Sequence, residues 1–489
     1  MNRPTVEKGE KGSTTRSRNR DLFWKFVNYL KDYCANCTLV GFAYIANSRL
    51  HFTERIFWLF CVVLSAMGCY YLINDYQSSF PTRAASIVYE SLPPFSKWKF
   101  PTISMCEVVY KYELTEQVEA YIRSLGGDVD GGDYNFEVES HIAYILFPHQ
   151  YHEGIIKNHC QAPEEECSTC AQCPTENYRQ IQRQFGANCS DLFVNCQLSG
   201  KKFDCCRYFL PLITPYGLCF MLNSLQNNEP GSKHWLRTEL DPANEKALLQ
   251  VNTNLPVQVS LLNAEDIPHT ALQPVGVSVT DPGQGKYLQF HRQTMDNDPD
   301  VHEIDPKLRS CRFPEENLPL SVYKAYSFST CLSDCTRNIQ MAKCGCTPYY
   351  MNPLADPRYP DCGLDGLLCL ELNMVAKPDA KLLMNNNKGF NDSCGCLPSC
   401  NDGDIQAIYE AISTFEKGTI QRNITLSMPA LPTDQYRRQA LRTRLDVVVS
   451  MGGMLGLFLG ASILSGIEFI YFFTVRAINN ARRNRSARP

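Results

Sequence analysis

Two long apolar stretches interrupt a chain that is otherwise mildly polar. The first, Ile56–Asn74, has no charged residue in 19 positions and is bounded by Arg55 and Asp75. At about 1.5 Å per residue, it just crosses a hydrocarbon core of roughly 30 Å. The second, Val447–Val475, is 29 residues long, which is more than a straight span needs. We therefore predict two membrane-spanning helices, at 56–74 and 447–475.

Charges beside these runs indicate how the chain is oriented in the membrane. Residues 1–55 carry ten Lys and Arg against five acids, and residues 475–489 carry five Arg and no acid. Basic flanks stay on the cytosolic side, and the first span usually decides the orientation. Four arginines before the second span run against this assignment: Arg437, Arg438, Arg442 and Arg444.

The expected organisation follows from the two spans. The charged start, MNRPTVEKGEKG, lacks the pattern of a cleaved signal peptide, so the first span should be an uncleaved anchor. We expect both termini in the cytosol and the long middle outside the cell. The predicted parts are a cytosolic N-terminus (1–55), the first span (56–74), an extracellular domain (75–446), the second span (447–475) and a cytosolic C-terminus (476–489).

The segment before the first span has apolar residues at helical spacing: Leu22, Phe23, Phe26, Val27 and Leu30. An interfacial helix and an ordinary buried helix fit this pattern equally well. Cys34 and Cys37 follow it. Free thiols are the default reading of this pair, with palmitoylation as the alternative.

The second apolar run contains features that a simple anchor does not need. Glu468 is its one carboxylate, and a charge at mid-membrane costs about 3 kcal/mol. Such acids usually face a water-filled path or a partner. The alternative is a position near the cytosolic interface, where Glu468 either snorkels or pairs with Arg476. The run also holds five glycines, Gly452, Gly453, Gly456, Gly460 and Gly466, which either shape a pathway or allow close helix packing.

The region between the spans predicts a disulfide-rich mixed α/β domain. Twenty of the 24 cysteines lie there, as do the glycosylation sequons at Asn188, Asn391 and Asn423. Residues 257–261 and 275–279 alternate apolar and polar positions as strands do. The CxxCxxC spacing of Cys167, Cys170 and Cys173 also suits zinc, but an oxidised extracellular framework fits the context better.

Catalysis finds little support in this chain. It has no GxSxG, HExxH, Walker loop or GxGxxG after a strand. A metal site is conceivable at His141, His149, His152 and His159, although a surface cluster or part of a loop is the better interpretation. We expect no enzyme activity, no cofactor, no resident metal and no nucleic-acid partner.

Four motifs resemble the epithelial sodium channel/degenerin (amiloride-sensitive sodium channel) family, and especially its insect pickpocket branch. Residues 100–106 (FPTISMC) are similar to the family's FPAVTIC block, and residues 217–223 (GLCFMLN) to its GxCYTFN block. Tyr326-Ser327, with the cysteine series from Cys331 to CGCLPSC at 394–400, matches the family's thumb pattern. Gly460-Ala461-Ser462, followed by Ser465-x-x-Glu468, matches its selectivity-filter segment.

The resemblance implies a fold and a partnership. It implies a trimer, of one chain or of related subunits, whose second spans line a central sodium pathway in the plasma-membrane lipid. It implies a finger-like region at about 107–219 and a thumb-like region at about 311–400. It also implies six disulfides, Cys106–Cys219, Cys311–Cys400, Cys331–Cys396, Cys335–Cys394, Cys344–Cys369 and Cys346–Cys362. Cys196 would pair with Cys205 or Cys206.

The resemblance also assigns roles within the spans. Gly460, Ala461 and Ser462 would form the selectivity filter, where carbonyls freed at a break in the helix and the Ser462 hydroxyl replace the water shell of the ion. Pore and gate positions would be Val449, Ser450, Gly453, Gly456 and Glu468. The family's gating pair before the first span is His-Gly, and here it is Val40-Gly41. Val449 replaces a small residue, and Ser450 replaces the acid of acid-sensing members, so neither proton gating nor the resting open probability follows from the resemblance.

We therefore expect a sodium-selective, amiloride-sensitive channel subunit that serves sensory or epithelial sodium entry. A trimeric ATP-gated cation channel is the runner-up, because it also has two spans and many cysteines. A two-span adhesion or scaffold protein without a pore is the alternative from a different class.

Overall fold

The described part of the chain forms two compact units, seen here in a computed structural model. One unit combines the two ends of the chain, within residues 1–86 and 440–489, and the other is the large domain, residues 87–439. The structure describes residues 24, 27–79, 85–92, 96–108, 116–124, 136–150, 156, 173–272, 274–376, 394–415, 420–431, 434–441 and 444–486.

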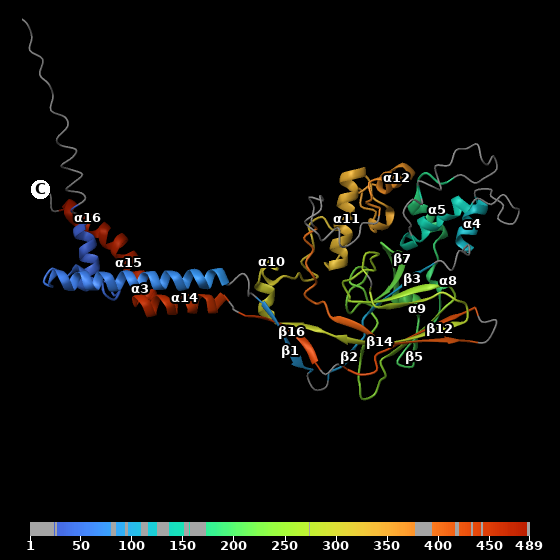
Figure 1. Cartoon of the computed structure of the whole chain (residues 1–489), viewed down its shortest axis with the longest axis horizontal. Helices are drawn as coiled ribbons and strands as arrows, with labels where there is room; N and C mark the ends of the chain where they lie inside the picture. Colours follow the sequence, from blue (N-terminus) through green and yellow to red (C-terminus); the bar gives the residue numbers. More distant parts are fainter. Residues whose placement is uncertain are drawn as a thin grey trace, which may run out of the picture. The chain divides into compact units, whose positions relative to one another are not determined.

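The unit formed by the chain ends is built of helices. Residues 27–36 are helical and precede α2 (Phe42–Ala46) and α3 (Phe52–Ser79). The C-terminal part adds α14 (Arg444–Leu459), α15 (Ile463–Tyr471), the π-helical turn η5 (Phe472–Arg476) and α16 (Ala477–Ser486). α14 runs beside α3 (Figure 1). The two helices meet closely at Gly68, where an added β-carbon would lie 3.0 Å from the Phe458 ring.

The first predicted span, 56–74, lies wholly within α3. Large apolar side chains on α3 are exposed on the single chain, including Phe57 (60%), Phe60 (62%) and Tyr70 (74%). Among the described helices, α3 is the one that is long and apolar enough to cross a membrane by itself. A long helix with an exposed apolar surface suits a hydrocarbon environment, where every backbone hydrogen bond is satisfied within the helix.

The second predicted span, 447–475, is not one continuous helix. Residues 445–459 and 463–480 pass the same membrane test together, and they are bent by 72° at the break between them. The break coincides with the Gly460–Ser462 segment, where the backbone leaves the helical conformation for three residues.

Within the described residues, four sheets organise the large domain. The five-stranded sheet has the order β11-β10-β3-β7-β6 and the six-stranded sheet β14-β12-β15-β9-β4-β5; smaller sheets are β1-β16-β13 and β2-β8. The strands are β1 (Ala85–Ser91), β2 (Trp98–Lys99), β3 (Thr102–Glu107), β4 (Phe193–Leu198), β5 (Lys201–Phe203), β6 (Phe209–Thr214), β7 (Gly217–Leu222), β8 (Glu239–Leu240), β9 (Leu248–Thr253), β10 (Val257–Leu262), β11 (Gly276–Val279), β12 (Gln284–Gln293), β13 (Met295–Asn297), β14 (Asp404–Thr414), β15 (Arg422–Ser427) and β16 (Asp434–Ala440).

The two large sheets share the main core, and the alternation of the sequence explains how. Val257, Val259 and Leu261 recur every second residue in β10 and are buried, so the strand predicted there is confirmed, as is its partner β11. Side chains from the six-stranded sheet, such as Leu249 and Ile424, join the same cluster.

Side chains from six helical segments form a second core in the large domain: α4 (Glu116–Ser124), α5 (Phe136–Leu146), α7 (Tyr178–Phe185), α11 (Phe328–Cys344), η4 (Tyr349–Met351) and α12 (Leu364–Leu372). Further described helical segments are η2 (Pro148–Gln150), α8 (Cys189–Leu192), α9 (Cys205–Tyr208), η3 (Pro299–Glu303) and α10 (Pro306–Arg309). α11 begins at the N-cap Ser327 and ends at Gly345, whose φ of +70° favours glycine.

Eight disulfides that each join two described residues brace the large domain. They include the six pairs that the resemblance implies, together with Cys189–Cys206 and Cys196–Cys205. The choice left open for Cys196 is therefore Cys205. Cys331 and Cys335 are one turn apart on α11, so both reach the same following segment, at Cys396 and Cys394. Cys34, Cys37, Cys61 and Cys69 are free thiols.

Candidate functional site

The break in the second span begins with the end of α14. Gly460 has φ +62°, a left-handed conformation that costs an L-residue roughly 1–2 kcal/mol but costs glycine little. Its N–H donates to the Gly456 carbonyl at 2.9 Å, and the Ala461 N–H donates to the Leu455 carbonyl at 3.2 Å. The negative end of the α14 dipole therefore lies at this segment, which favours a nearby cation.

The next helix starts at Ser462, which is the N-cap of α15. Its hydroxyl accepts from the Ser465 N–H at 3.2 Å, and its own N–H donates to the Ser465 hydroxyl at 3.2 Å. This reciprocal cap satisfies donors that a helix start leaves unpaired. Gly460 and Ser462 together let the chain end one helix and begin another inside an apolar segment.

The pore positions predicted on α14 share one side of the helix. Val449, Gly453 and Gly456 recur at intervals of four and three residues, with Ser450 beside them. At 100° per residue, Phe458 lies on the opposite side, and Phe458 is the residue that meets Gly68 of α3. The glycine face therefore points away from α3. A β-carbon added at Gly453 would meet no atom within 4 Å.

The Val40-Gly41 pair lies directly against the break. The Val40 N–H donates to the Leu459 carbonyl at 3.2 Å, and a β-carbon added at Gly460 would lie 2.6 Å from Val40 Cγ2. Gly41 has φ +94°, and a β-carbon there would lie 2.5 Å from Val62 of α3. Glycine is required at position 41 for both its conformation and its close approach.

Glu468 contacts the segment before the first span. Its Oε2 accepts from the Thr38 N–H at 3.1 Å and from the Thr38 hydroxyl at 2.8 Å. The interfacial pair considered for Glu468 and Arg476 does not form, because Arg476 binds the Asp32 carboxylate at 2.9 Å instead. Hydrogen bonds from Thr38, and not pairing with Arg476, therefore hold this half-buried acid.

Sequence reasoning missed the aromatic contacts that hold the N-terminal helix to the second span. The Tyr29 hydroxyl donates to the Phe472 carbonyl. The Tyr33 ring packs at 5.1–5.8 Å between ring centres against Phe469, Phe472 and Phe473. Tyr33 is buried, so the helix at 27–36 packs on the second span. Leu22, Phe23 and Phe26 of the predicted apolar pattern lie outside the described residues. The spacing of its apolar residues indicated a helix with an apolar side, but such spacing does not show which segment packs against that side.

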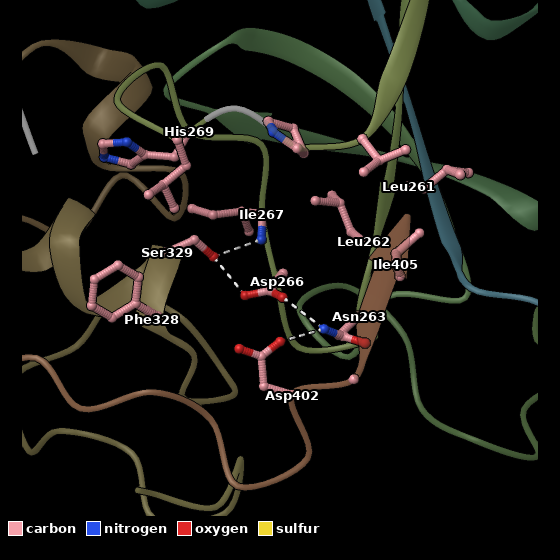
Figure 2. A pocket seen from close by; sticks show the side chains of 14 residues that line it. Leu261, Leu262, Asn263, Asp266, Ile267, His269, Phe328, Ser329, Asp402 and Ile405 are labelled. Atoms are coloured by element: carbon pink, nitrogen blue, oxygen red, sulfur yellow. Dashed lines mark hydrogen bonds between the residues drawn. The ribbon is translucent and has the colours of Figure 1, made fainter. Parts of the chain in front are cut away.

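A second polar feature lies in the large domain, where acids from two chain segments meet. Figure 2 shows the cavity of about 330 Å³ that they border with apolar residues such as Leu262. Asp266 accepts from the Ser329 hydroxyl of α11 at 2.9 Å, and Asp402 accepts from the Asn263 amide at 2.8 Å. These bonds join the loop after β10 to the start of α11 and to the chain after Cys400.

Burial shifts the titration of this acidic group. Desolvation, together with the nearby Asp266 carboxylate, raises the pKa of Glu265 to about 7, against a hydrogen bond of 2.6 Å from the Ser399 hydroxyl. Desolvation and Asp266 also raise the pKa of Asp402 to about 6. Among the described residues, no Lys or Arg lies within 4.0 Å of these three carboxylates. Part of this group is therefore protonated near neutral pH.

The predicted glycosylation sites differ in their surroundings. Asn188 is exposed and begins α8, with its amide 3.2 Å from Asp191. Asn423 is half-buried in β15, and its amide donates to Asn252 at 2.6 Å. Asn391 lies outside the described residues.

The possible metal clusters receive no support from the part of the chain that is described. No group of three or more His, Cys, Asp or Glu side chains there is placed to hold a metal ion. His141 and His149 instead contact the backbone carbonyls of Pro174 and Tyr216. Cys173 is disulfide-bonded, while Cys167, Cys170, His152 and His159 lie outside the described residues.

Comparison with known families decides the identity. Residues 33–472 match the family model described as amiloride-sensitive sodium channel. The chain belongs to the amiloride-sensitive sodium channel family. The match includes the Val40-Gly41 pair, the disulfide-rich domain and the broken second span. The family is described as one of sodium channels.

The individual relatives include insect and nematode proteins. Pickpocket protein 19 of Drosophila melanogaster is 25% identical over 321 residues, covering 58% of this chain and 60% of that protein. Pickpocket protein 28 of the same organism is 22% identical and covers 91% of this chain and 78% of its own length. Degenerin del-1 of Caenorhabditis elegans is 25% identical over 63% of this chain and 47% of its own length. The matched part is thus about three-fifths of the first relative and half of the third.

Proposed function

We propose that this chain is a subunit of a sodium-selective, amiloride-sensitive channel, in which three identical or related chains surround one pathway. The observation that carries the proposal is the break at Gly460–Ser462 within an apolar segment of membrane-spanning length. A membrane helix is interrupted only where the freed backbone is buried in protein or lines a water-filled path. The break therefore supports the filter assigned from the sequence.

The broken helix can coordinate an ion through its own dipoles. The C-terminal end of α14 gathers carbonyl oxygens with partial negative charge at Gly460, and the Ser462 hydroxyl lies two residues further along. Three such segments around one axis make a ring of oxygens that replaces the water shell of the ion. Selectivity then depends on ring diameter, which small side chains set.

The remaining pore positions follow the same face of α14. Gly453 and Gly456 leave room beside the axis, and Val449 and Ser450 lie nearer the start of the helix. We assign these two as gate positions and Gly453 and Gly456 as pore-lining positions. Val40-Gly41, which contacts the break, provides the route by which the cytosolic N-terminus influences the filter.

The proposed topology places both termini in the cytosol and the large domain outside the cell. The disulfide network and the exposed Asn188 sequon support that side for the large domain. The exposed apolar surface of α3 would meet membrane lipid. Sodium entry through such a channel needs no energy source, because 100 mV supplies about 2.3 kcal/mol per charge.

Ion substitution in voltage-clamped oocytes tests the proposal. The chain is expressed alone or with related subunits, and its surface level is measured in each case. Amiloride-blocked sodium current supports it, ATP-evoked current supports the ATP-gated alternative, and no current with any partner supports the adhesion or scaffold alternative. Ser462→Cys should shift the reversal potential when external sodium is replaced by potassium, because it removes a hydroxyl ligand and changes ring diameter.

A matched control separates the filter from general damage. Ser413→Cys makes the same chemical change in β14 of the large domain and should leave the reversal potential unchanged. Unchanged sodium-to-potassium permeability in both Ser462 and Gly460 variants, with robust currents, would mean that these small residues serve helix packing only.

A further inference from the structure

Thr38 connects the filter segment to Glu468 through a continuous chain of hydrogen bonds. The Ser462 N–H donates to the Ser465 hydroxyl at 3.2 Å, and the hydroxyls of Ser465 and Thr38 are 2.8 Å apart. The Thr38 hydroxyl lies 2.8 Å from Glu468 Oε2. Thr38 precedes the first span, whereas the other three residues belong to the second.

The acceptor at the end of these hydrogen bonds determines which group donates in each of them. An ionised carboxylate only accepts hydrogen bonds, so the single Thr38 hydroxyl proton points to Glu468. The Ser465 proton is then the one shared with the Thr38 oxygen, and the Ser465 oxygen is free to accept from Ser462. Each hydroxyl donates once and accepts once, so the arrangement is self-consistent. The Thr38 backbone N–H adds a second bond to the same carboxylate oxygen, at 3.1 Å.

The position of Glu468 explains why such support matters. Ser465 and Glu468 are three residues apart on α15 and therefore lie on the same side of that helix. A carboxylate in an apolar segment is costly unless donors or water surround it. Two of its donors come from one residue, and that residue is held by Val40, two positions on, which bonds to Leu459 at the end of α14.

We propose that Thr38 is a positioning residue for ion conduction: it fixes the Glu468 carboxylate relative to the Ser462–Ser465 cap, and so sets the negative charge that a cation meets next to the filter. This inference rests on the proposed function. It adds a residue outside both spans to the determinants of permeation. A side chain that only packed the N-terminal segment would need the shape of threonine but not its hydroxyl.

Four variants separate the hydroxyl from the shape. Thr38→Val keeps the branched shape and the N–H but removes the hydroxyl, and Thr38→Ser keeps the hydroxyl. Glu468→Gln removes the charge, and the fourth variant combines Glu468→Gln with Thr38→Val. The matched control is Thr53→Val in α3, since the hydroxyl of Thr53 is hydrogen-bonded to His51, just before α3, and lies outside the chain of bonds from Ser462 to Glu468.

The readouts are single-channel conductance and the sodium-to-potassium permeability ratio, with surface expression held equal. We expect Thr38→Val to change one of them by about twofold or more, and Thr38→Ser and Thr53→Val to leave both near the parent values. Thr38→Val should add nothing in the Glu468→Gln background, because residues that act through one contact are not additive. Parent-like permeation in Thr38→Val, or equal and additive effects in the double variant, overturns the inference.

Hydrogen exchange gives a second test that does not require current. In the purified full-length chain, Glu468→Ala should speed exchange of the Thr38 amide by about tenfold, because that N–H loses a charged acceptor. Exchange within α3 should stay unchanged. An unchanged exchange rate of the Thr38 amide in Glu468→Ala overturns the inference directly. If Ser462→Cys alters selectivity but the Thr38 variants and the exchange of the Thr38 amide show no effect, the filter assignment stands and only the role of Thr38 fails. If Ser462→Cys leaves selectivity unchanged while Glu468→Ala still speeds exchange of the Thr38 amide, the filter assignment is rejected instead.

Discussion

Val40 and Gly460 are in contact although they come from opposite ends of the chain. A β-carbon at Gly460 would lie 2.6 Å from Val40 Cγ2, and the Val40 N–H bonds to Leu459, the neighbour of Gly460. The segment before the first span thus touches the one point at which the second span is broken. A substitution at either residue should therefore alter the packing of the other.

Gly460→Ala should abolish most of the current with little loss of surface protein. Alanine there adds roughly 1–2 kcal/mol of backbone strain and collides with Val40. Adding Val40→Ala removes the collision but not the strain, so we expect partial recovery of current in the double variant. The control is Gly466→Ala in α15, where a β-carbon would meet nothing within 4 Å. Equal currents in the parent and in Gly460→Ala would contradict the geometry.

The thumb disulfide Cys331–Cys396 should stabilise the large domain by about 2–4 kcal/mol. Cys331→Ser leaves Cys396 unpaired, and we expect a lower unfolding temperature and reduced surface delivery. The double variant Cys331→Ser/Cys396→Ser should be no worse than either single change. The measurements are thermal unfolding of purified protein and surface biotinylation. Clearly additive losses in the double variant would reject the pairing.

Glycan mapping tests the orientation of the large domain. Ser190→Ala destroys the Asn188 sequon while leaving the Asn188 cap of α8 in place, so it should remove one glycan without disturbing the fold. Loss of all three sequons, at Asn188, Asn391 and Asn423, should remove the mass shift on enzymatic deglycosylation. As a control, a sequon introduced within the first 30 residues should stay unmodified. Its modification would invert the proposed topology.

The buried acids predict a pH dependence of stability. The pKa of Glu265 in the folded chain, about 7, lies above its ordinary value of 4.5. The contribution of Glu265 to the free energy of unfolding is therefore fully present below about pH 4.5 and is lost as the pH rises through about 7. The folded chain should unfold at a lower temperature at pH 8 than at pH 6. Arg292 and Arg438 oppose this effect, because they favour the charged forms of Glu265 and Asp402.

A pair of variants isolates this contribution. Glu265→Gln should flatten the change in unfolding temperature between pH 6 and pH 8. Glu410→Gln, on the outer strand β14, should follow the parent curve because Glu410 pairs with Lys286 at a half-exposed surface. Parallel curves for the parent and Glu265→Gln would show that this carboxyl does not titrate in that range.

Much of the architecture was readable from local patterns. An uncharged run of membrane length predicts a helix wherever it occurs, and α3 contains that run. Alternating apolar residues predicted β10 and β11, since a strand has a period of two residues. Spacing alone left the cysteine pairs open, and the family resemblance supplied six of them. The choice between Cys205 and Cys206 as the partner of Cys196 needed the tertiary structure, because adjacent residues lie equally near in sequence and differ in the direction of their side chains.

The sequence by itself determined the two apolar runs, the disulfide-rich middle and the small residues that allow a helix to break at Gly460–Ser462. These are local properties, because propensity and periodicity act over a few neighbouring residues. Only the tertiary structure decided what meets the break: Thr38 bonds to Glu468, and Asp32, not Glu468, binds Arg476. The same holds for the acids of the large domain, whose titration depends on burial. Such contacts join residues that are remote in sequence, and no local pattern specifies which of many possible partners a folded chain brings together.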